Sequence, residues 1–247
     1  MTSWLDRLRA DLDRRMTPAI LFIRDDDGGW ADEALDALLD LTEQRGVPID
    51  VALIPDACDE RIVRTLRGRR AQAVHLHQHG RAHINHELDA RKCEFGPSRR
   101  ADQQRADIRL GRQRLVDLVG DRLEPIFTPP WNRCTEVTVQ CLVDLQFRLL
   151  SRDVTAPPAH HPLLAELPVA LDWTGRYGVR AGIAEWGLAI AECIRDSQQP
   201  VGMMLHHAVM SAADRRLLSE FLDVVAVHPM VVCKSMIELA DAPRGAL

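Results

Sequence analysis

Three consecutive aspartates, Asp25, Asp26 and Asp27, end an apolar segment near the start of the chain, AILFIRDDDGGW at residues 19–30. A short apolar run that is followed by turn-forming glycines is typical of a strand covered on both faces. In α/β proteins such strands carry ligand-binding side chains at their C-terminal ends. Because adjacent carboxylates repel one another, a bound cation, hydrogen bonds or open solvent must offset their charge.

Histidines are concentrated in a second segment, where five of the ten in the chain fall within twelve residues. On a strand, His75, His77 and His79 would point to one face. A turn after His79 would bring the ring of His83 to the same point, which metal ligation requires. A solvated polar loop is the other interpretation, and it explains His86 better than it explains the histidines embedded in the strand.

The two segments together supply one carboxylate and two imidazoles for a divalent ion, and they leave coordination positions open for water and substrate. Two later strand ends add further candidates. The segment FTPPWNR offers Trp131 as a wall and Arg133 as a cation. The buried strand VGMML is followed by His206 and His207. Taken alone, each of these later segments favours a structural role.

The elements that must position these side chains alternate between strand and helix. The expected strands lie within 19–30 and at 49–54, 73–79, 125–128, 147–151, 167–171, 201–206 and 230–232. The expected helices lie at 3–16, 31–45, 59–66, 99–119, 136–145, 181–196 and 212–226. This alternation over 247 residues predicts a single domain, residues 1–247, built as an α/β barrel of parallel strands. An open doubly wound sheet is the alternative.

The composition weighs against several classes of function. A formal net charge of -5 and a pI near 6.1 give little electrostatic support for nucleic-acid binding, and 4% aromatic residues argue against an extended stacking surface. Neither a dinucleotide-binding glycine motif nor a P-loop occurs. The charged N-terminal segment and the lack of a long apolar run predict a cytoplasmic protein without a membrane partner. The six cysteines have no paired spacing, so we interpret them as free thiols.

The ordered motifs resemble those of the polysaccharide deacetylase superfamily, the carbohydrate esterase family 4-like deacetylases. RDDDG resembles the T-F-D-D-G motif through Asp26, Asp27 and Gly28, and HGRAH resembles the H-x-x-x-H motif through His79 and His83. TPPW resembles the family's R-x-P segment, and MMLH resembles its late L-x-H. The segments QHGRAHINH, EFG and PPWNR are also similar to those of a bacterial branch of this superfamily.

The resemblance implies a distorted (β/α) barrel of about seven parallel strands in which Asp27, His79 and His83 hold a divalent metal. Zinc is the expected ion, with cobalt, nickel or iron as alternatives. By the same resemblance, Asp26 is the general base and His206 the general acid. General chemistry agrees with these roles, since a metal acidifies a water molecule, a carboxylate takes its proton, and a histidine protonates the departing amine.

The chain departs from the family pattern at several positions. Thr128 stands where the family has an arginine that pairs with the base, and either Arg133 or Arg24 is expected to replace it. Asp25 occupies a position that is usually apolar, so it either bonds a neighbouring backbone group or changes the pocket. His207 is the alternative to His206 as the acid. The predicted catalytic residues are Asp26, His206 and Arg133, and the predicted substrate-binding residues are Trp131, Asn132, His207 and Asp25.

The sequence therefore predicts a metal-dependent hydrolase that removes an acyl group, with acetyl preferred, from an amino sugar or a related N-acyl compound. The substrate is expected to be a small molecule or a carrier-linked compound. Two alternatives stay open: another carbon-nitrogen hydrolase such as a cyclic amidase, and a catalytically silent binding protein that keeps the fold. Retention of both Asp26 and Asp27 weighs against the silent protein, and the oligomeric state is left open.

Overall fold

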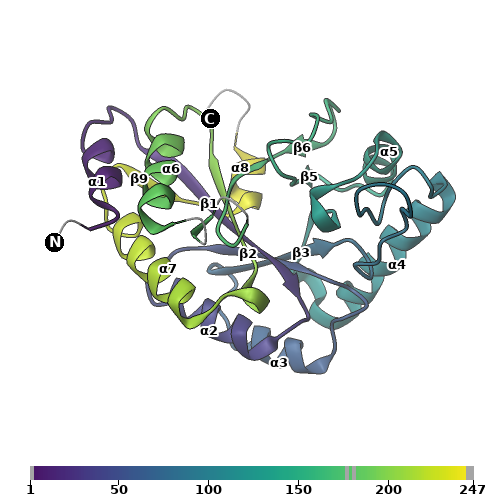
Figure 1. The fold of residues 1–247 in the computed structure, drawn as a ribbon. Coiled ribbons are helices and arrows are strands. Elements are labelled where there is room, and N and C mark those ends of the chain that lie inside the picture. Colours follow the sequence, from purple (N-terminus) through teal and green to yellow (C-terminus); the bar gives the residue numbers. More distant parts are fainter. Residues whose placement is uncertain (1–2, 176–177, 180–181, 243–247) are drawn as a thin grey trace.

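Strand β1 (Ala19–Gly28) lies at the centre of the fold in the computed structural model, which describes residues 3–175, 178–179 and 182–242. β1 pairs in parallel with β2 (Ile49–Leu53) and with β8 (Val201–Leu205). β9 (Val231–Cys233) pairs with the first residues of β1. The sheet curls about this central strand, and its helices lie mainly on the outer side (Figure 1).

Among the described residues, nine strands form one sheet in the order β6-β5-β4-β3-β2-β1-β8-β7, with β9 beside β1. The other strands are β3 (Val74–His79), β4 (Leu123–Thr128), β5 (Leu149–Leu150), β6 (Ala165–Glu166) and β7 (Val169–Asp172). The helices are α1 (Asp6–Leu12), α2 (Asp32–Glu43), α3 (Glu60–Arg67), α4 (Ala101–Val119), α5 (Glu136–Asp144), α6 (Ile183–Arg195), α7 (Ala212–Val225) and α8 (Met236–Asp241). Short 3-10 turns are η1 (Gly120–Arg122), η2 (Pro130–Asn132) and η4 (His207–Val209).

The strand order follows the chain around a barrel. Strands β6 and β7, at the two ends of the order, are separated only by Leu167 and Pro168. A bridge between Asp153 and Val169 also joins the chain after β5 to β7. Every strand pairing within the described part of the chain is parallel. The predicted distorted (β/α) barrel is thus confirmed in preference to the open sheet.

Short elements account for the differences from the predicted boundaries. Strand β6 and helix α8 were not predicted, because two and six residues are too few to show a period of alternation. The strand predicted at 167–171 begins at Val169, since Pro168 has no N–H for the ladder. The predicted helix at 181–196 is observed from Ile183, and residue 181 lies outside the described residues. The single-domain prediction for residues 1–247 stays a prediction.

Alternation along β1 separates two cores. Leu21 and Ile23 pack against the outer helices, whereas Phe22 points into the barrel. Inside the barrel, Phe22 and Met204 pack with Met236 of α8, so this short helix closes the N-terminal end of the barrel with apolar side chains. The C-terminal end of the interior is polar instead. Phe22 and Met204 therefore form an apolar layer beneath the polar opening.

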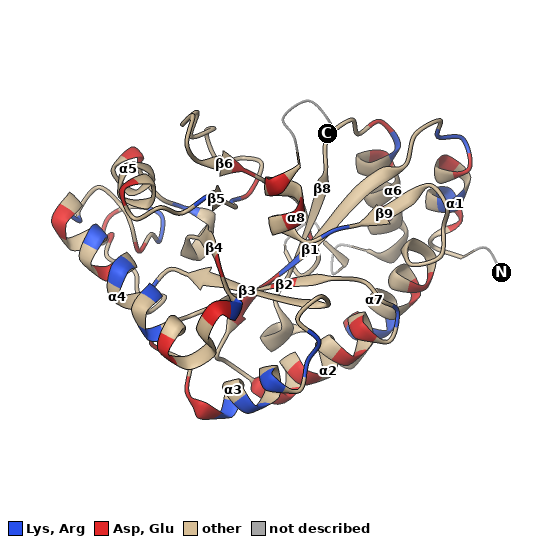
Figure 2. Cartoon of the chain, turned by 180° about the vertical axis from the view of Figure 1, so that it is seen from behind, with Lys and Arg blue, Asp and Glu red and all other residues tan. Residues whose placement is uncertain are grey.

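Helices α2, α3, α4 and α7 follow the outer side of the curled sheet (Figure 1). Helices α3, α4 and α7 carry both acidic and basic residues, whereas the charged residues of α2 are all acidic (Figure 2). These four helices therefore do not form a continuous basic surface for a polyanion. No helix in the described ranges is both long enough and apolar enough to cross a bilayer.

One buried carboxyl group of the barrel floor should make stability depend on pH. Asp50 is 0% exposed and accepts hydrogen bonds from the Met236 N–H at 3.1 and 3.0 Å. Burial raises its pKa to about 8. Between about pH 4 and pH 8 the folded protein therefore holds a proton that the unfolded chain releases, so the free energy of unfolding falls as pH rises through this window. We expect a fall on the order of 2–4 kcal/mol.

Urea denaturation at pH 5, 7 and 8.5 measures this effect in the wild type and in Asp50→Asn, whose amide imitates the protonated acid. In this variant the free energy of unfolding should fall much less as the pH rises. Asp121→Asn, at an exposed position, is the matched control and should show the same fall as the wild type. Equal pH dependence in the wild type and in Asp50→Asn would contradict the assignment of the proton to Asp50.

Candidate active site

A carboxylate and two imidazoles converge at the C-terminal ends of β1 and β3. Asp27 Oδ1 lies 3.4 Å from His79 Nε2 and 3.4 Å from His83 Nε2. Of the described residues, this trio is one of two groups whose ligand atoms all lie within 4.8 Å of one another. The second group, Asp50, His75 and Glu124, comes from the N-terminal ends of β2, β3 and β4. The three predicted metal ligands are thus brought together.

Local backbone geometry turns Asp27 toward this point. Alternation along a regular strand would send Asp26 and Asp27 to opposite faces of the sheet. Asp27 instead has φ of 70°, and the register with β2 shifts between Asp25 and Gly28. His83 is also left-handed, with φ of 57°. Left-handed conformations of residues other than glycine are strained by about 1–2 kcal/mol each, and such strain is concentrated at functional sites.

The trio fits a divalent cation. The Nδ1 atom of His79 lies 3.0 Å from the Thr128 carbonyl, which can only accept, so Nδ1 carries a proton and the lone pair of Nε2 faces Asp27. Asp27 Oδ1 is buried and accepts no hydrogen bond from the residues that the structure describes. Donor atoms that surround a tetrahedral ion at about 2.1 Å are themselves about 3.4 Å apart. The two distances from Asp27 Oδ1 to the histidine nitrogens match that requirement.

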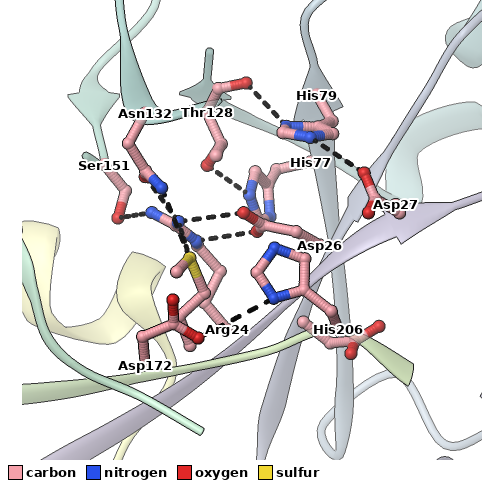
Figure 3. A network of polar contacts seen from close by, with 12 residues as sticks. Arg24, Asp26, Asp27, His77, His79, Thr128, Asn132, Ser151, Asp172 and His206 are labelled. Carbon is pink, nitrogen blue, oxygen red and sulfur yellow. Dashed lines mark hydrogen bonds and ion pairs between the residues drawn. The ribbon is translucent and has the colours of Figure 1, made fainter. Parts of the chain in front are cut away.

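Asp26 is held by Arg24 from the same strand. Arg24 Nε donates to Asp26 Oδ1 at 2.8 Å, and Nη2 donates to Oδ2 at 3.0 Å (Figure 3). Both side chains are almost fully buried. Burial alone would raise the pKa of Asp26, but the charges of Arg24, His79 and His206 and the hydrogen bonds from Arg24 lower it to about 2. Asp26 is therefore an ionised carboxylate beside the candidate metal ligands Asp27, His79 and His83.

Three further groups orient the Arg24 guanidinium. Nη1 donates to Ser151 Oγ at 2.8 Å, and Nη2 donates to Asn132 Oδ1 at 2.7 Å. Nη2 also lies 3.0 Å from the sulfur of Met204. Of the two residues predicted to replace the missing motif arginine, Arg24 is the one that pairs with Asp26. Ser151 was not among the predicted site residues, because its only signal is a position at the end of a short strand.

His206 faces the same cluster from the end of β8, as Figure 3 shows. Its Nδ1 lies 3.2 Å from Thr174 Oγ1 and 4.0 Å from Asp172 Oδ1. Its side chain is 25% exposed, so a substrate can reach the ring. Burial raises the pKa of Asp172, with the charge of His206 acting in the opposite direction.

No protein-family model and no curated protein matches the chain, whereas solved structures match it over most of its length. A presumed polysaccharide deacetylase from Mycobacterium smegmatis has a TM-score of 0.70 at 19% identity, over 91% of this chain and 89% of that one. A family 4 acetyl xylan esterase from Clostridium thermocellum, in complex with a cobalt ion, has a TM-score of 0.58 at 12% identity, over 89% of each chain. The chain has the polysaccharide deacetylase fold. The resemblance predicted from the motifs is therefore confirmed for the fold.

A third similar structure shows that this fold does not guarantee activity. A family 4 pseudoenzyme from Bacillus anthracis has a TM-score of 0.55 at 12% identity, over 92% of this chain and 66% of that one. The side chains that this chain places on the polysaccharide deacetylase fold therefore decide its function.

Asp25 and His207, predicted to bind substrate, are instead paired with one another behind the site. His207 Nδ1 lies 2.5 Å from Asp25 Oδ2, and the His207 N–H donates to Oδ1 at 3.0 Å. Both side chains are 0% exposed, so a substrate cannot reach them. His207 Nε2 lies 2.7 Å from the Trp30 carbonyl, and the charge of Asp25 overcomes burial to raise the pKa of His207 to about 9. His206, and not His207, faces the cluster.

Arg133 lies away from Asp26 and donates from Nη1 to the Lys92 carbonyl at 2.8 Å. The prediction named Arg133 before Arg24 as the arginine beside Asp26, whereas the structure places Arg24 there. Trp131 packs against the His83 ring with centroids 4.4 Å apart, and Trp30 does so at 5.0 Å. The two indoles flank the metal trio as walls, although only one of them was predicted.

Glu94, in the EFG segment, holds the loop that carries His83. Its carboxylate accepts hydrogen bonds from the N–H groups of Arg81 at 3.2 Å and Ala82 at 2.8 Å. Gly80 makes the approach possible, because a Cβ there would collide with the Glu94 carboxylate and lie 2.6 Å from Pro130, and because its φ is 56°. The separation of Glu94 from the loop along the chain did not predict this contact.

Glu94→Ala should loosen this loop. Two N–H groups would lose their acceptor, so we expect the free energy of unfolding to fall by about 2–4 kcal/mol. Metal affinity should fall roughly tenfold, because the loop orients a ligand. Denaturation and metal titration measure the two effects. Glu94→Gln keeps one acceptor oxygen, so its stability and metal affinity should lie between those of the wild type and Glu94→Ala. Unchanged metal affinity in Glu94→Ala would show that the loop is ordered without this carboxylate.

Proposed function

We propose that this protein is a metal-dependent hydrolase that removes an acetyl group from an amino sugar or a related N-acyl compound. The observation that carries the proposal is the buried, ionised Asp26, held by Arg24 beside the Asp27, His79 and His83 trio. A purely structural ion would need the trio alone. A second carboxylate kept free of the ion supports a base for hydrolysis.

Asp27, His79 and His83 would hold the ion, with zinc proposed first and cobalt, nickel or iron as alternatives. When bound, the ion would polarise the acyl carbonyl and increase the acidity of a water molecule. The predicted cytoplasmic location also stays a prediction.

The remaining chemistry belongs to side chains of this protein. Asp26 accepts a proton from the attacking water at its carboxylate, while Arg24 keeps that carboxylate ionised and oriented. The water adds its oxygen to the acyl carbon, the C–N bond breaks, and the acyl group leaves as acetate. His206 donates a proton to the departing nitrogen, and Asp172 and Thr174 orient its ring.

Acetate release from a panel of N-acetylated sugars, N-acetylated nucleotide sugars and cyclic amides tests the proposal. The protein is stripped of metal and reloaded with zinc, cobalt, nickel or iron before each assay. Release of acetate with one equivalent of metal supports the deacetylase. Ring opening of the cyclic amides without acetate release would favour the amidase alternative. Metal binding without any hydrolysis would favour a silent binding protein.

A further inference from the structure

A cavity of about 310 Å³ adjoins the candidate active site on the side of the Arg24 cluster. Asn132 and Met204, which contact Arg24, form part of its wall. Asp172, which lies beside His206, forms another part. A substrate whose acyl group lies between Asp26 and His206 would therefore extend its remaining atoms into this cavity.

Two arginines line the same cavity without an acidic partner. The exposed Arg91 and the half-buried Arg133 have no carboxylate oxygen within 4.0 Å among the residues that the structure describes. Burial lowers the pKa of Arg133, and the charge of Arg91 lowers it further. Arg133 uses Nη1 for the Lys92 carbonyl, which holds the guanidinium in place and leaves its other N–H groups for a ligand.

The other charged groups of the cavity are already engaged. Arg152 is ion-paired with Glu166 and donates to the Pro157 carbonyl. Asp153 accepts a hydrogen bond from the Thr155 N–H at 2.7 Å. Asp172 also lines the cavity; its carboxylate accepts a hydrogen bond from the Thr174 N–H at 3.2 Å and lies 4.0 Å from His206 Nδ1. Asp153 acts on the pKa of Arg133 in the direction opposite to Arg91, but in the described part of the chain neither aspartate forms an ion pair with Arg91 or Arg133.

We propose that Arg91 and Arg133 form a subsite for an anionic substituent, a phosphate or a carboxylate, on the N-acylated substrate. This inference rests on the proposed function for the position of the acyl group. Guanidinium groups bind both anions through paired N–H donors. Arg133 is half-buried and Arg91 is exposed, so the subsite would lie at the open side of the cavity. Trp131 supplies an apolar wall beside the two arginines for the sugar ring. The preferred substrate is thus an acidic N-acyl amino sugar and not a neutral one.

Three probes that share an N-acetyl amino sugar test the subsite. They are N-acetylglucosamine, which is neutral, N-acetylglucosamine 6-phosphate and N-acetylmuramic acid, which carries a carboxylate. Calorimetric affinities are measured with the metal-loaded Asp26→Asn protein, which should bind without turnover, and kcat/KM is measured with the wild type. We expect one or both acidic probes to bind about 10- to 100-fold more tightly than the neutral probe. Comparison of the phosphate-bearing probe with the carboxylate-bearing probe then identifies the preferred anion.

The double substitution Arg91→Gln and Arg133→Gln should remove most of the preference for acidic probes. In the protein that keeps both arginines, 0.5 M NaCl should weaken this preference. Arg109→Gln, at an exposed position on α4, is the matched control and should retain the preference. Equal affinity for acidic and neutral probes, or a preference that survives the double substitution, would overturn the subsite and leave the proposed function standing. Arginine-dependent binding without acetate release would overturn the proposed function and leave the subsite standing.

Discussion

Asp27→Ala should abolish metal binding and lower kcat/KM for acetate release by about 10³-fold or more. The substitution leaves two imidazoles without the carboxylate that lies 3.4 Å from both. The two imidazoles that remain, His79 at the end of β3 and His83 in a left-handed turn, bind a divalent ion far more weakly than three ligands. The ion also contributes several kcal/mol to stabilising the developing charge. Elemental analysis of purified protein and initial rates with a substrate from the panel measure the two effects.

A histidine of the same segment provides the matched control. His86 lies outside the trio, and its Nε2 is 2.7 Å from an Arg99 nitrogen. His86→Ala should therefore retain one metal ion per chain, whereas His79→Ala should behave like Asp27→Ala. Full metal content in both Asp27→Ala and His79→Ala would refute the metal site.

Asp26→Asn should keep the metal ion but lower kcat by roughly 10² to 10⁴-fold, the usual contribution of a general base. Asparagine fills the same volume but cannot take a proton from water. The variant also leaves the buried Arg24 charge unpaired, so we expect it to be less stable by about 3–5 kcal/mol. Rates, metal content and the free energy of unfolding should be measured below the temperature at which the variant unfolds.

The double variant Arg24→Gln with Asp26→Asn separates the loss of chemistry from the loss of stability. It removes both members of the ion pair, so it should recover part of the lost stability without recovering activity. A metal-loaded Asp26→Asn protein that turned over at the wild-type rate would rule out this residue as the base.

Patterns confined to one segment were predictable. The strand that ends in the aspartate cluster, the shared face of His75, His77 and His79, and the α/β barrel all follow from short-range periodicity, because strand and helix periods depend on neighbouring residues. The same alternation already places Arg24 and Asp26 on one face. Alternation alone does not show whether this face points into the barrel or toward the helices, because that depends on how the barrel closes.

Pairings between distant segments required the tertiary structure. Whether His206 or His207 faces the site depends on Asp25, which lies 182 residues away from His207 and takes it out of solvent. Glu94 reaches the metal-site loop only because the intervening chain folds back on itself. Such contacts depend on which segments meet in space, and no local period encodes that.

By itself, the sequence determined the strand that ends in the three aspartates, the histidine-bearing strand beside it and the identity of the candidate metal ligands. The tertiary structure decided how the aspartates divide their roles. A left-handed turn at Asp27 directs two adjacent carboxylates to one side, and Arg24 turns inward to hold Asp26. Asp25 points outward to His207 because strand neighbours alternate between the barrel interior and the helix layer.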